Sequence, residues 1–107
     1  MNMKKSFARF HVGQPIHHKL FDYRGVIADV DANYQGNSEW YEKIARSRPP
    51  KNAPWYHILV DGTEHWTYVA ERNLERDVTG EPIDHPDLGE VFKNFSDGQY
   101  YRRGGVN

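Results

Sequence analysis

Six histidines and fifteen acidic residues are the side chains of this sequence that could bind a metal or transfer protons. A metal centre needs imidazole and carboxylate groups that converge on one point. His57 and His65 fall on facing arms of an expected hairpin, where a one-residue change of register moves a side chain to the opposite face. His17 and His18 are adjacent, so they point to opposite faces of a strand, and no His-Glu-x-x-His pattern occurs. We therefore expect hydrogen-bonded or exposed histidines and no metal site.

Side chains that act as nucleophiles or hold a cofactor are scarce. The chain has no cysteine, which excludes thiol catalysis, disulfides and cysteine-based zinc sites. It has no Gly-x-Ser-x-Gly elbow, no phosphate-binding loop and no dinucleotide fingerprint. We predict a binding protein that is not an enzyme and uses no cofactor. A small hydrolase or a metal protein is the alternative from another class.

Basic and aromatic residues are interleaved in one stretch of the chain. The stretch contains Trp40, Tyr41, Lys43, Arg46, Arg48, Lys51 and Trp55. Lysine and arginine neutralise phosphates while aromatic rings stack on bases, so the pattern is typical of nucleic-acid contact. Exposed aromatic residues beside arginine are also typical of protein interfaces. The residues alone leave both interpretations open.

The charge of the chain is unevenly distributed. The formal net charge is −1, but residues 1–55 carry nine basic and five acidic side chains, and residues 56–107 carry five and ten. The two halves therefore have net charges of +4 and −5, and such a split can mark a surface that faces a polyanion. The first residues lack the apolar stretch of a signal peptide, and no run approaches the ~20 apolar residues of a membrane span, so we expect a cytoplasmic protein.

Short strands and turns must position these residues. A strand is predicted to begin near Pro15, and another covers residues 26–31, where apolar and acidic side chains alternate with a period of two. Residues 54–60 and 64–70 are predicted to pair through the Asp61-Gly62 turn, because Asp-Gly favours the positive φ angles of hairpin turns. Further along the chain we expect a helical turn at 71–74, a strand at 75–78 and a capped turn at 85–92, with Tyr56, Trp66 and Tyr68 as buried fold-forming residues.

Residues 33–54 interrupt the pattern of strands. Ser38 is placed to cap a helix over 39–45, and Pro49-Pro50 would end it, because proline clashes with the preceding turn. A loop of this length in a compact domain is often functional. A chain of 107 residues has room for one domain. We therefore predict a small all-β barrel with one long loop and short-helix insertion.

Several blocks of this sequence resemble, in order, motifs of the HspQ/YccV-like hemimethylated-DNA-binding family. They are Phe10–His18 with Tyr23–Asp31, then Ala53–Val60, then Thr67–Leu74, and a final His85–Tyr100 block that is similar to longer versions of the domain. The resemblance covers about residues 10–102 and implies a single domain with an SH3-like β-barrel. It also implies a homo-oligomer, a trimer. Two activities are implied: binding of hemimethylated double-stranded DNA, and a heat-shock role in which the protein helps a Lon-type protease degrade client proteins.

The function predicted from the resemblance is therefore an HspQ-like stress protein that modulates Lon-dependent proteolysis and binds hemimethylated DNA. The alternative is a dedicated hemimethylated-DNA module that regulates replication initiation. The residues expected to contact DNA are Lys19, Arg24, Arg46, Arg48, Lys51, Arg102 and Arg103. The residues expected to contact a protein partner are Trp40, Tyr41, Trp55, Tyr100 and Tyr101.

Overall fold

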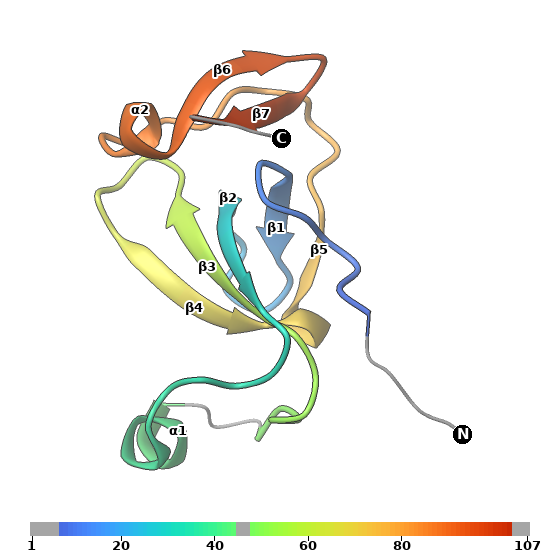
Figure 1. The fold of residues 1–107 in the computed structure, drawn as a ribbon, viewed down its shortest axis with the longest axis vertical. Coiled ribbons are helices and arrows are strands. Elements are labelled where there is room, and N and C mark those ends of the chain that lie inside the picture. Colours follow the sequence, from blue (N-terminus) through green and yellow to red (C-terminus); the bar gives the residue numbers. More distant parts are fainter. Residues whose placement is uncertain (1–6, 45–47, 104–107) are drawn as a thin grey trace.

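A five-stranded antiparallel sheet that curls on itself forms the body of the protein (Figure 1). The computed structural model describes residues 7–44 and 48–103. The strands of the sheet are β1 (Pro15–His18), β2 (Arg24–Asp31), β3 (Trp55–Val60), β4 (Trp66–Ala70) and β5 (Leu74–Arg76), in the order β4-β3-β2-β1-β5. A second sheet contains β6 (Phe92–Ser96) and β7 (Gln99–Arg102), and the helical elements are α1 (Ser38–Ile44), η1 (Glu71–Asn73) and α2 (Leu88–Val91). The predicted all-β class is confirmed.

The curled sheet is open at one seam. β1 pairs with β2 on one side and with β5 on the other, whereas β4 and β5 form the two outer strands of the sheet. Only the 3₁₀ turn η1 separates β4 from β5 in the sequence, so it carries the chain from one edge of the sheet to the other. The fold is therefore a partly open version of the expected small barrel.

The inner face of the curled sheet forms the main core. Ile16, Ile27, Tyr56, Ile58 and Leu74 have almost no exposed surface there. Burial of such side chains is the main favourable contribution to folding, at ~25 cal/mol per Å² of apolar surface. The Tyr56 hydroxyl donates a hydrogen bond to Glu71 at 2.6 Å, so the one polar atom of this ring has a partner. The prediction that Tyr56 is a core residue is confirmed.

The β6–β7 hairpin and α2 cover the outer face of β2 and β3 (Figure 1). Val26, Ala28 and Leu59 pack there against Phe92 and Tyr100. We did not predict this hairpin, although its turn is another Asp-Gly pair with φ angles of 54° and 75°. Gly13 docks the hairpin on the sheet, because its carbonyl accepts the Tyr100 N–H at 2.9 Å and a Cβ there would lie 2.0 Å from the Tyr100 oxygen.

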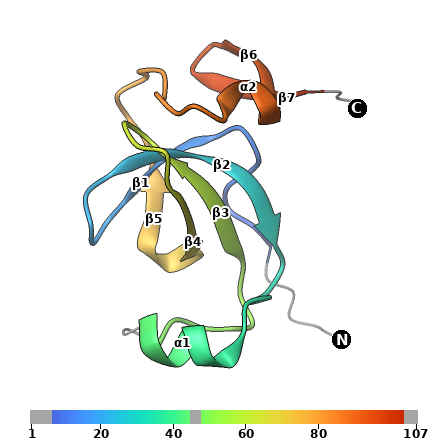
Figure 2. The same cartoon turned by 90° about the vertical axis from the view of Figure 1, so that its left-hand side faces the viewer.

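The segment between β2 and β3 forms an arm beyond the end of the sheet, and α1 lies on it (Figures 1 and 2). The helix begins at Ser38, one residue before the predicted start. Asn37, not Ser38, caps it, since its side-chain oxygen accepts the Trp40 N–H at 2.7 Å. In the described part of the chain, no helix has the length and apolar character needed to cross a membrane.

Candidate functional site

Five aromatic rings pack together where the β2–β3 segment meets the sheet, and we call them the insertion cluster. They are Tyr34, Trp40, Tyr41, Trp55 and Tyr68. Tyr34 is central, with its ring centroid 4.9 Å from that of Trp55 and 5.4 Å from that of Tyr41. Trp55 is only 2% exposed. Aromatic contacts of this kind stabilise beyond the area that they bury, so the cluster gives the arm a core of its own.

Hydrogen bonds from the insertion cluster hold the following loop in place. The Trp55 indole N–H donates to the Pro50 carbonyl at 3.0 Å, and the Tyr41 hydroxyl donates to the Pro49 carbonyl at 2.5 Å. Two prolines cannot donate backbone hydrogen bonds, so these carbonyl contacts are the means by which the aromatic rings anchor them. Residues 49 and 50 are thereby fixed against the cluster.

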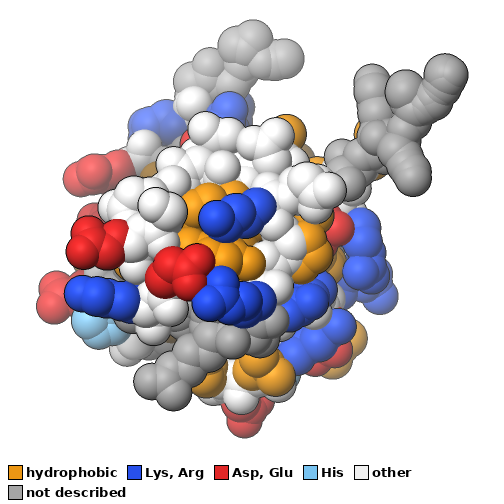
Figure 3. All heavy atoms as spheres, turned by 90° about the horizontal axis from the view of Figure 1, so that it is seen from below, with side chains coloured by type: hydrophobic (Ala, Val, Ile, Leu, Met, Phe, Trp, Pro, Cys, Tyr) orange, Lys and Arg blue, Asp and Glu red, His pale blue; other side chains and the backbone are white. Residues whose placement is uncertain are grey.

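Basic side chains surround this cluster on the surface of the arm. Lys43, Arg48 and Lys51 are exposed there, and we call these three residues the basic end. The Lys51 ammonium lies 4.3 Å from the centroid of the Tyr41 ring, a cation–π distance. Arg48 forms a two-pronged ion pair with Glu42 at 2.7 and 3.1 Å. Figure 3 shows an apolar patch on this side of the molecule with lysine and arginine side chains, and acidic ones between them, at its border.

The other cations predicted to contact DNA lie elsewhere. Arg102 and Arg103 belong to the end of the β6–β7 hairpin, at the opposite end of the molecule from α1 (Figure 1). The Arg103 guanidinium donates to the Gly89 carbonyl at 2.8 Å. Lys19 is exposed in the loop between β1 and β2, and Arg46 lies outside the described residues. One continuous patch containing all seven predicted residues is therefore not formed within one chain.

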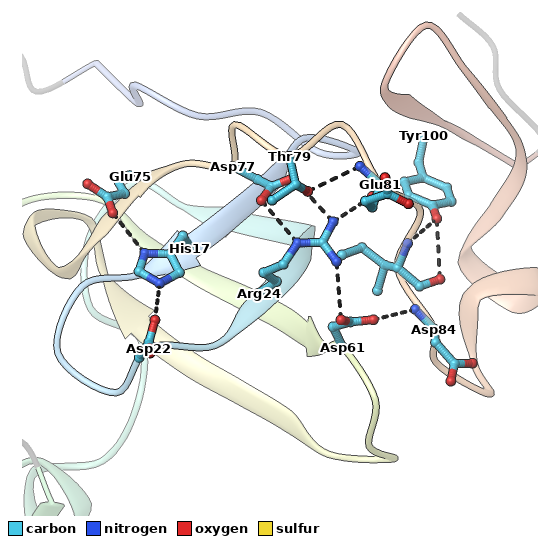
Figure 4. Close-up of polar contacts among 11 residues, drawn as sticks. His17, Asp22, Arg24, Asp61, Glu75, Asp77, Thr79, Glu81, Asp84 and Tyr100 are labelled. Atoms are coloured by element: carbon cyan, nitrogen blue, oxygen red, sulfur yellow. Dashed lines mark hydrogen bonds and ion pairs between the residues drawn. The ribbon is translucent and has the colours of Figure 1, made fainter.

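Arg24 is held inside the fold by acidic groups (Figure 4). Its guanidinium binds both carboxylate oxygens of Asp77 at 3.0 and 3.2 Å, one oxygen of Asp61 at 3.2 Å and the Glu81 carbonyl at 2.5 Å. The Asp77 side chain is only 3% exposed. We had expected Arg24 to face DNA, but these contacts direct its guanidinium toward β5 and the segment after it. The sequence could not reveal this, because the acidic partners are 37 and 53 residues away.

A groove of about 930 Å³ runs between the arm and the loop of residues 19–23. Figure 2 shows these two segments projecting from the sheet, with β4 between them. The lining includes Leu20, Phe21, Tyr23, Trp40, Trp66 and Tyr68. Leu20 and Trp66 are largely exposed, and Phe21 is 74% exposed. Exposed apolar groups gathered in a groove are typical of a surface that binds a partner.

His18 organises the loop that forms one wall of this groove. Its Nδ1 atom accepts the backbone N–H groups of Leu20 and Phe21, both at 3.1 Å. Its ring stacks on the Phe21 ring at a centroid distance of 4.8 Å and contacts the Tyr23 ring at 5.0 Å. Burial lowers the pKa of His18, and the neighbouring His17 lowers it further, so the ring stays neutral and Nδ1 remains an acceptor.

The aromatic residues predicted to contact a partner are mostly inside the protein. Tyr41, Trp55 and Tyr100 are buried, and Trp40 is half-buried, whereas Tyr101 is exposed. Trp66, which we expected in the core, is exposed on the groove. The sequence reasoning missed Leu20 and Phe21. The sequence feature that could have identified them is an apolar pair in a short turn between two strands, where polar residues are usual.

A polar cluster lies on the outer face of β2 and β3, next to the groove. His57 Nε2 is 3.1 Å from Asp31 Oδ2, and the Tyr68 hydroxyl donates to the same oxygen at 2.6 Å. Asp29 is the cross-strand partner of His57, and a register shift in β2 precedes it. One ligand atom each from Asp29, Asp31 and His57 lies within 4.8 Å of the others. These are the residues of the described chain with the geometry to hold a metal ion.

A model of a known protein family matches most of the chain. The family model described as "Hemimethylated DNA-binding protein YccV like" matches residues 8–99. The match spans the curled sheet, the arm with α1, the groove and most of the β6–β7 hairpin.

Proposed function

The chain belongs to the YccV-like family of hemimethylated DNA-binding proteins, and from this premise we propose that it binds hemimethylated double-stranded DNA through the basic end. The observation that carries this choice of surface is the apolar patch of the arm with lysine and arginine side chains at its border (Figure 3). The family is a DNA-binding one, which supports a role based on binding.

The charges of the basic end set the expected strength of binding. Three cations that neutralise three phosphates give a logarithmic salt slope of about −2.7, which lowers the affinity about 40-fold between 50 and 200 mM salt. A net charge of −1 adds no general attraction to DNA. A homo-oligomer would repeat the basic end and raise the avidity for one duplex. The methyl group lies in the major groove, where an apolar contact discriminates it, and the apolar patch between the cations supplies such a surface.

The test measures fluorescence anisotropy with hemimethylated, fully methylated and unmethylated duplexes of one sequence. The variant Lys43→Gln/Arg48→Gln/Lys51→Gln removes the basic end while leaving the buried rings in place. We expect weaker binding to all three duplexes and a salt slope that is smaller in magnitude by about 2.7. The matched control is Lys93→Gln on β6, an exposed lysine on the hairpin. Unchanged affinity in the triple variant would exclude this surface, and equal affinity of the wild type for all duplexes would exclude methylation sensing.

We also propose a second role, in which the protein modulates the degradation of client proteins by a Lon-type protease in a heat-shock response. This role would be carried out in the cytoplasm. The groove favours this role, because its exposed Leu20, Phe21 and Trp66 side chains fit an apolar protein segment and not a phosphate backbone. β4 is an outer strand of the sheet and lines the groove. An extended client segment can therefore add to the β4 edge by backbone hydrogen bonds while its apolar side chains enter the groove.

Degradation assays with a Lon-type protease separate the two roles. The variant Leu20→Ser/Phe21→Ser should slow client degradation and leave hemimethylated-DNA affinity unchanged. Val78→Ser is the matched control, because Val78 is 86% exposed and does not line the groove. If wild-type protein changes no client's degradation rate, the alternative of a dedicated DNA module that regulates replication initiation is favoured. Light scattering on the same variant would show whether the groove instead holds a second copy of the chain.

A further inference from the structure

We propose that Asp29, Asp31 and His57 form a binding site for a divalent transition-metal ion, with Zn²⁺ as the reference ion. The backbone brings the three side chains to one face. Asp29 and Asp31 are two residues apart on β2, so they share a face of the strand, and His57 on β3 is paired with Asp29. The irregularity between Ile27 and Asp29 resets the register, and such a bulge re-aims the side chains that follow it.

The spacing of the ligand atoms fits a metal ion. His57 Nε2 and Asp31 Oδ2 are 3.1 Å apart, and the chosen atoms of all three residues lie within 4.8 Å. Two ligands at ~2.1 Å from a tetrahedral zinc ion are about 3.4 Å apart. Small side-chain rotations therefore suffice to place the ion between the carboxylates and the imidazole. The hydrogen bond between His57 and Asp31 is replaced by two bonds to the metal.

Tyr68 fixes the orientation of two of the three ligands. Its hydroxyl donates to Asp31 Oδ2 at 2.6 Å and accepts the Gln35 N–H at 3.0 Å. Its ring lies against the His57 ring, with centroids 4.6 Å apart. Metal-ligating carboxylates are commonly oriented by such outer partners, which strengthen binding.

The ligand types indicate which ion binds. Ca²⁺ and Mg²⁺ prefer all-oxygen ligands, whereas one imidazole with two carboxylates suits Zn²⁺, Mn²⁺ or Co²⁺. The two carboxylates of Asp29 and Asp31 beside the imidazole also attract a cation electrostatically. Three protein ligands leave a coordination position open. Because His57 and Tyr68 also line the groove, that position is accessible to a donor atom from a molecule bound there.

Isothermal titration of the full chain with ZnCl₂, and separately with CaCl₂ and MgCl₂, tests the site. We expect one Zn²⁺ per chain, no comparable binding of Ca²⁺ or Mg²⁺, and at least tenfold weaker Zn²⁺ binding in His57→Gln and Asp31→Asn. Asp29→Asn should disturb the fold less than the other two variants, because Asp29 is exposed and its carboxylate accepts the N–H of the adjacent Val30. His65→Gln is the matched control, since it removes an exposed histidine outside the cluster.

Two-dimensional NMR of the wild-type protein locates the bound ion without relying on variants. Zn²⁺ should shift the amide resonances of residues 29–31 and 57 before those near the other histidines. The proposal would be overturned if Zn²⁺ did not bind, or if it shifted only resonances near the other histidines. It would also be overturned if the Asp29→Asn and His57→Gln proteins stayed folded and bound Zn²⁺ as the wild type does.

Discussion

Replacement of Arg24 by glutamine should destabilise the protein strongly, because it leaves a buried carboxylate without its partner. Arg24 binds both oxygens of Asp77, whose side chain is 3% exposed, and also bonds Asp61 and the Glu81 carbonyl (Figure 4). Removing one partner of a buried ion pair costs about 3–5 kcal/mol. For a domain of this size, each kcal/mol lowers Tm by about 4 °C, so we expect a loss of roughly 12–20 °C.

The effect of Arg24→Gln should depend on pH in a defined direction. Burial raises the pKa of Asp77, but hydrogen bonds from Arg24 and Thr79 outweigh it and hold that pKa below its usual value of 3.8. In the wild type, the Asp77 contribution is therefore present above about pH 4 and is lost as the pH falls through the lower folded-state pKa. In the variant the hydrogen bonds and charge of Arg24 are lost and only the hydrogen bonds from Thr79 oppose burial, so the pKa of Asp77 rises. The stability difference between the two proteins should be largest at neutral pH and shrink below pH 4.

Urea and thermal denaturation followed by circular dichroism measure this effect. Asp77→Asn, added to Arg24→Gln, removes the unpaired charge and should restore a substantial part of the lost stability. A loss below about 1 kcal/mol, or no recovery in the double variant, would refute the reasoning, since exposed ion pairs contribute no more than that. At a temperature where Arg24→Gln is still folded, its affinity for hemimethylated DNA should remain within twofold of the wild type. A tenfold loss would return Arg24 to the DNA-contacting residues.

Three further predictions concern the ends of β1 and the docking of the hairpin. Hydrogen bonds to Asp22 and Glu75, each 2.7 Å, raise the pKa of His17. The protonated ring should therefore stabilise the fold by up to about 1 kcal/mol below pH 6.5, and this contribution should be lost as the pH rises. In urea titrations, His17→Gln should unfold more easily than the wild type at pH 6 but equally at pH 8.5. His18 has a lowered pKa, so its contribution to the stability of the fold is present above pH 6.5 and declines as the pH falls. His18→Phe removes the acceptor of two loop N–H groups, so it should cost about 1–3 kcal/mol of stability at pH 7.5 and increase amide exchange at residues 20 and 21. Gly13→Ala should lower Tm far more than Gly80→Ala. Both glycines have positive φ, but only at Gly13 would an added Cβ meet neighbouring backbone. Equal Tm losses in the two variants would contradict this account of hairpin docking.

Local sequence patterns predicted most of the curled sheet. The predicted strand over residues 26–31 is part of β2, and the Asp61-Gly62 pair marks the turn between β3 and β4. The predicted faces of that strand were wrong, because a register shift between Ile27 and Asp29 leaves Val26 and Ala28 under the hairpin and packs Val30 against the main core with Ile27. The presence of a strand and of a turn could be predicted because both depend on neighbouring residues: β-branched residues favour strands, and the turn needs positive φ. The same kind of signal, Asp97-Gly98, was present at the β6–β7 turn. The irregular register between Phe92 and Asn94 breaks the alternation in β6, so the hairpin was missed.

The family and its DNA-binding character could also be predicted from the sequence, because the blocks that carry the resemblance lie in order along the chain and the family model matches residues 8–99. The DNA and partner contacts of individual residues remain predictions. The basic residues around residue 48 are close in sequence, and they stay close in space because the insertion cluster anchors their loop.

The sequence alone thus determined the strand periodicity, the turns, the absence of thiol chemistry and the family. Only the tertiary structure decided which aromatic rings are core and which are surface: Trp55 and Tyr100 are buried, while Phe21 and Trp66 line an open groove. It also decided that Arg24 meets Asp77 and that Asp29, Asp31 and His57 converge. The physical reason is that these ion pairs and clusters join residues 26 to 53 positions apart, and composition and spacing carry no information on which distant segments will meet.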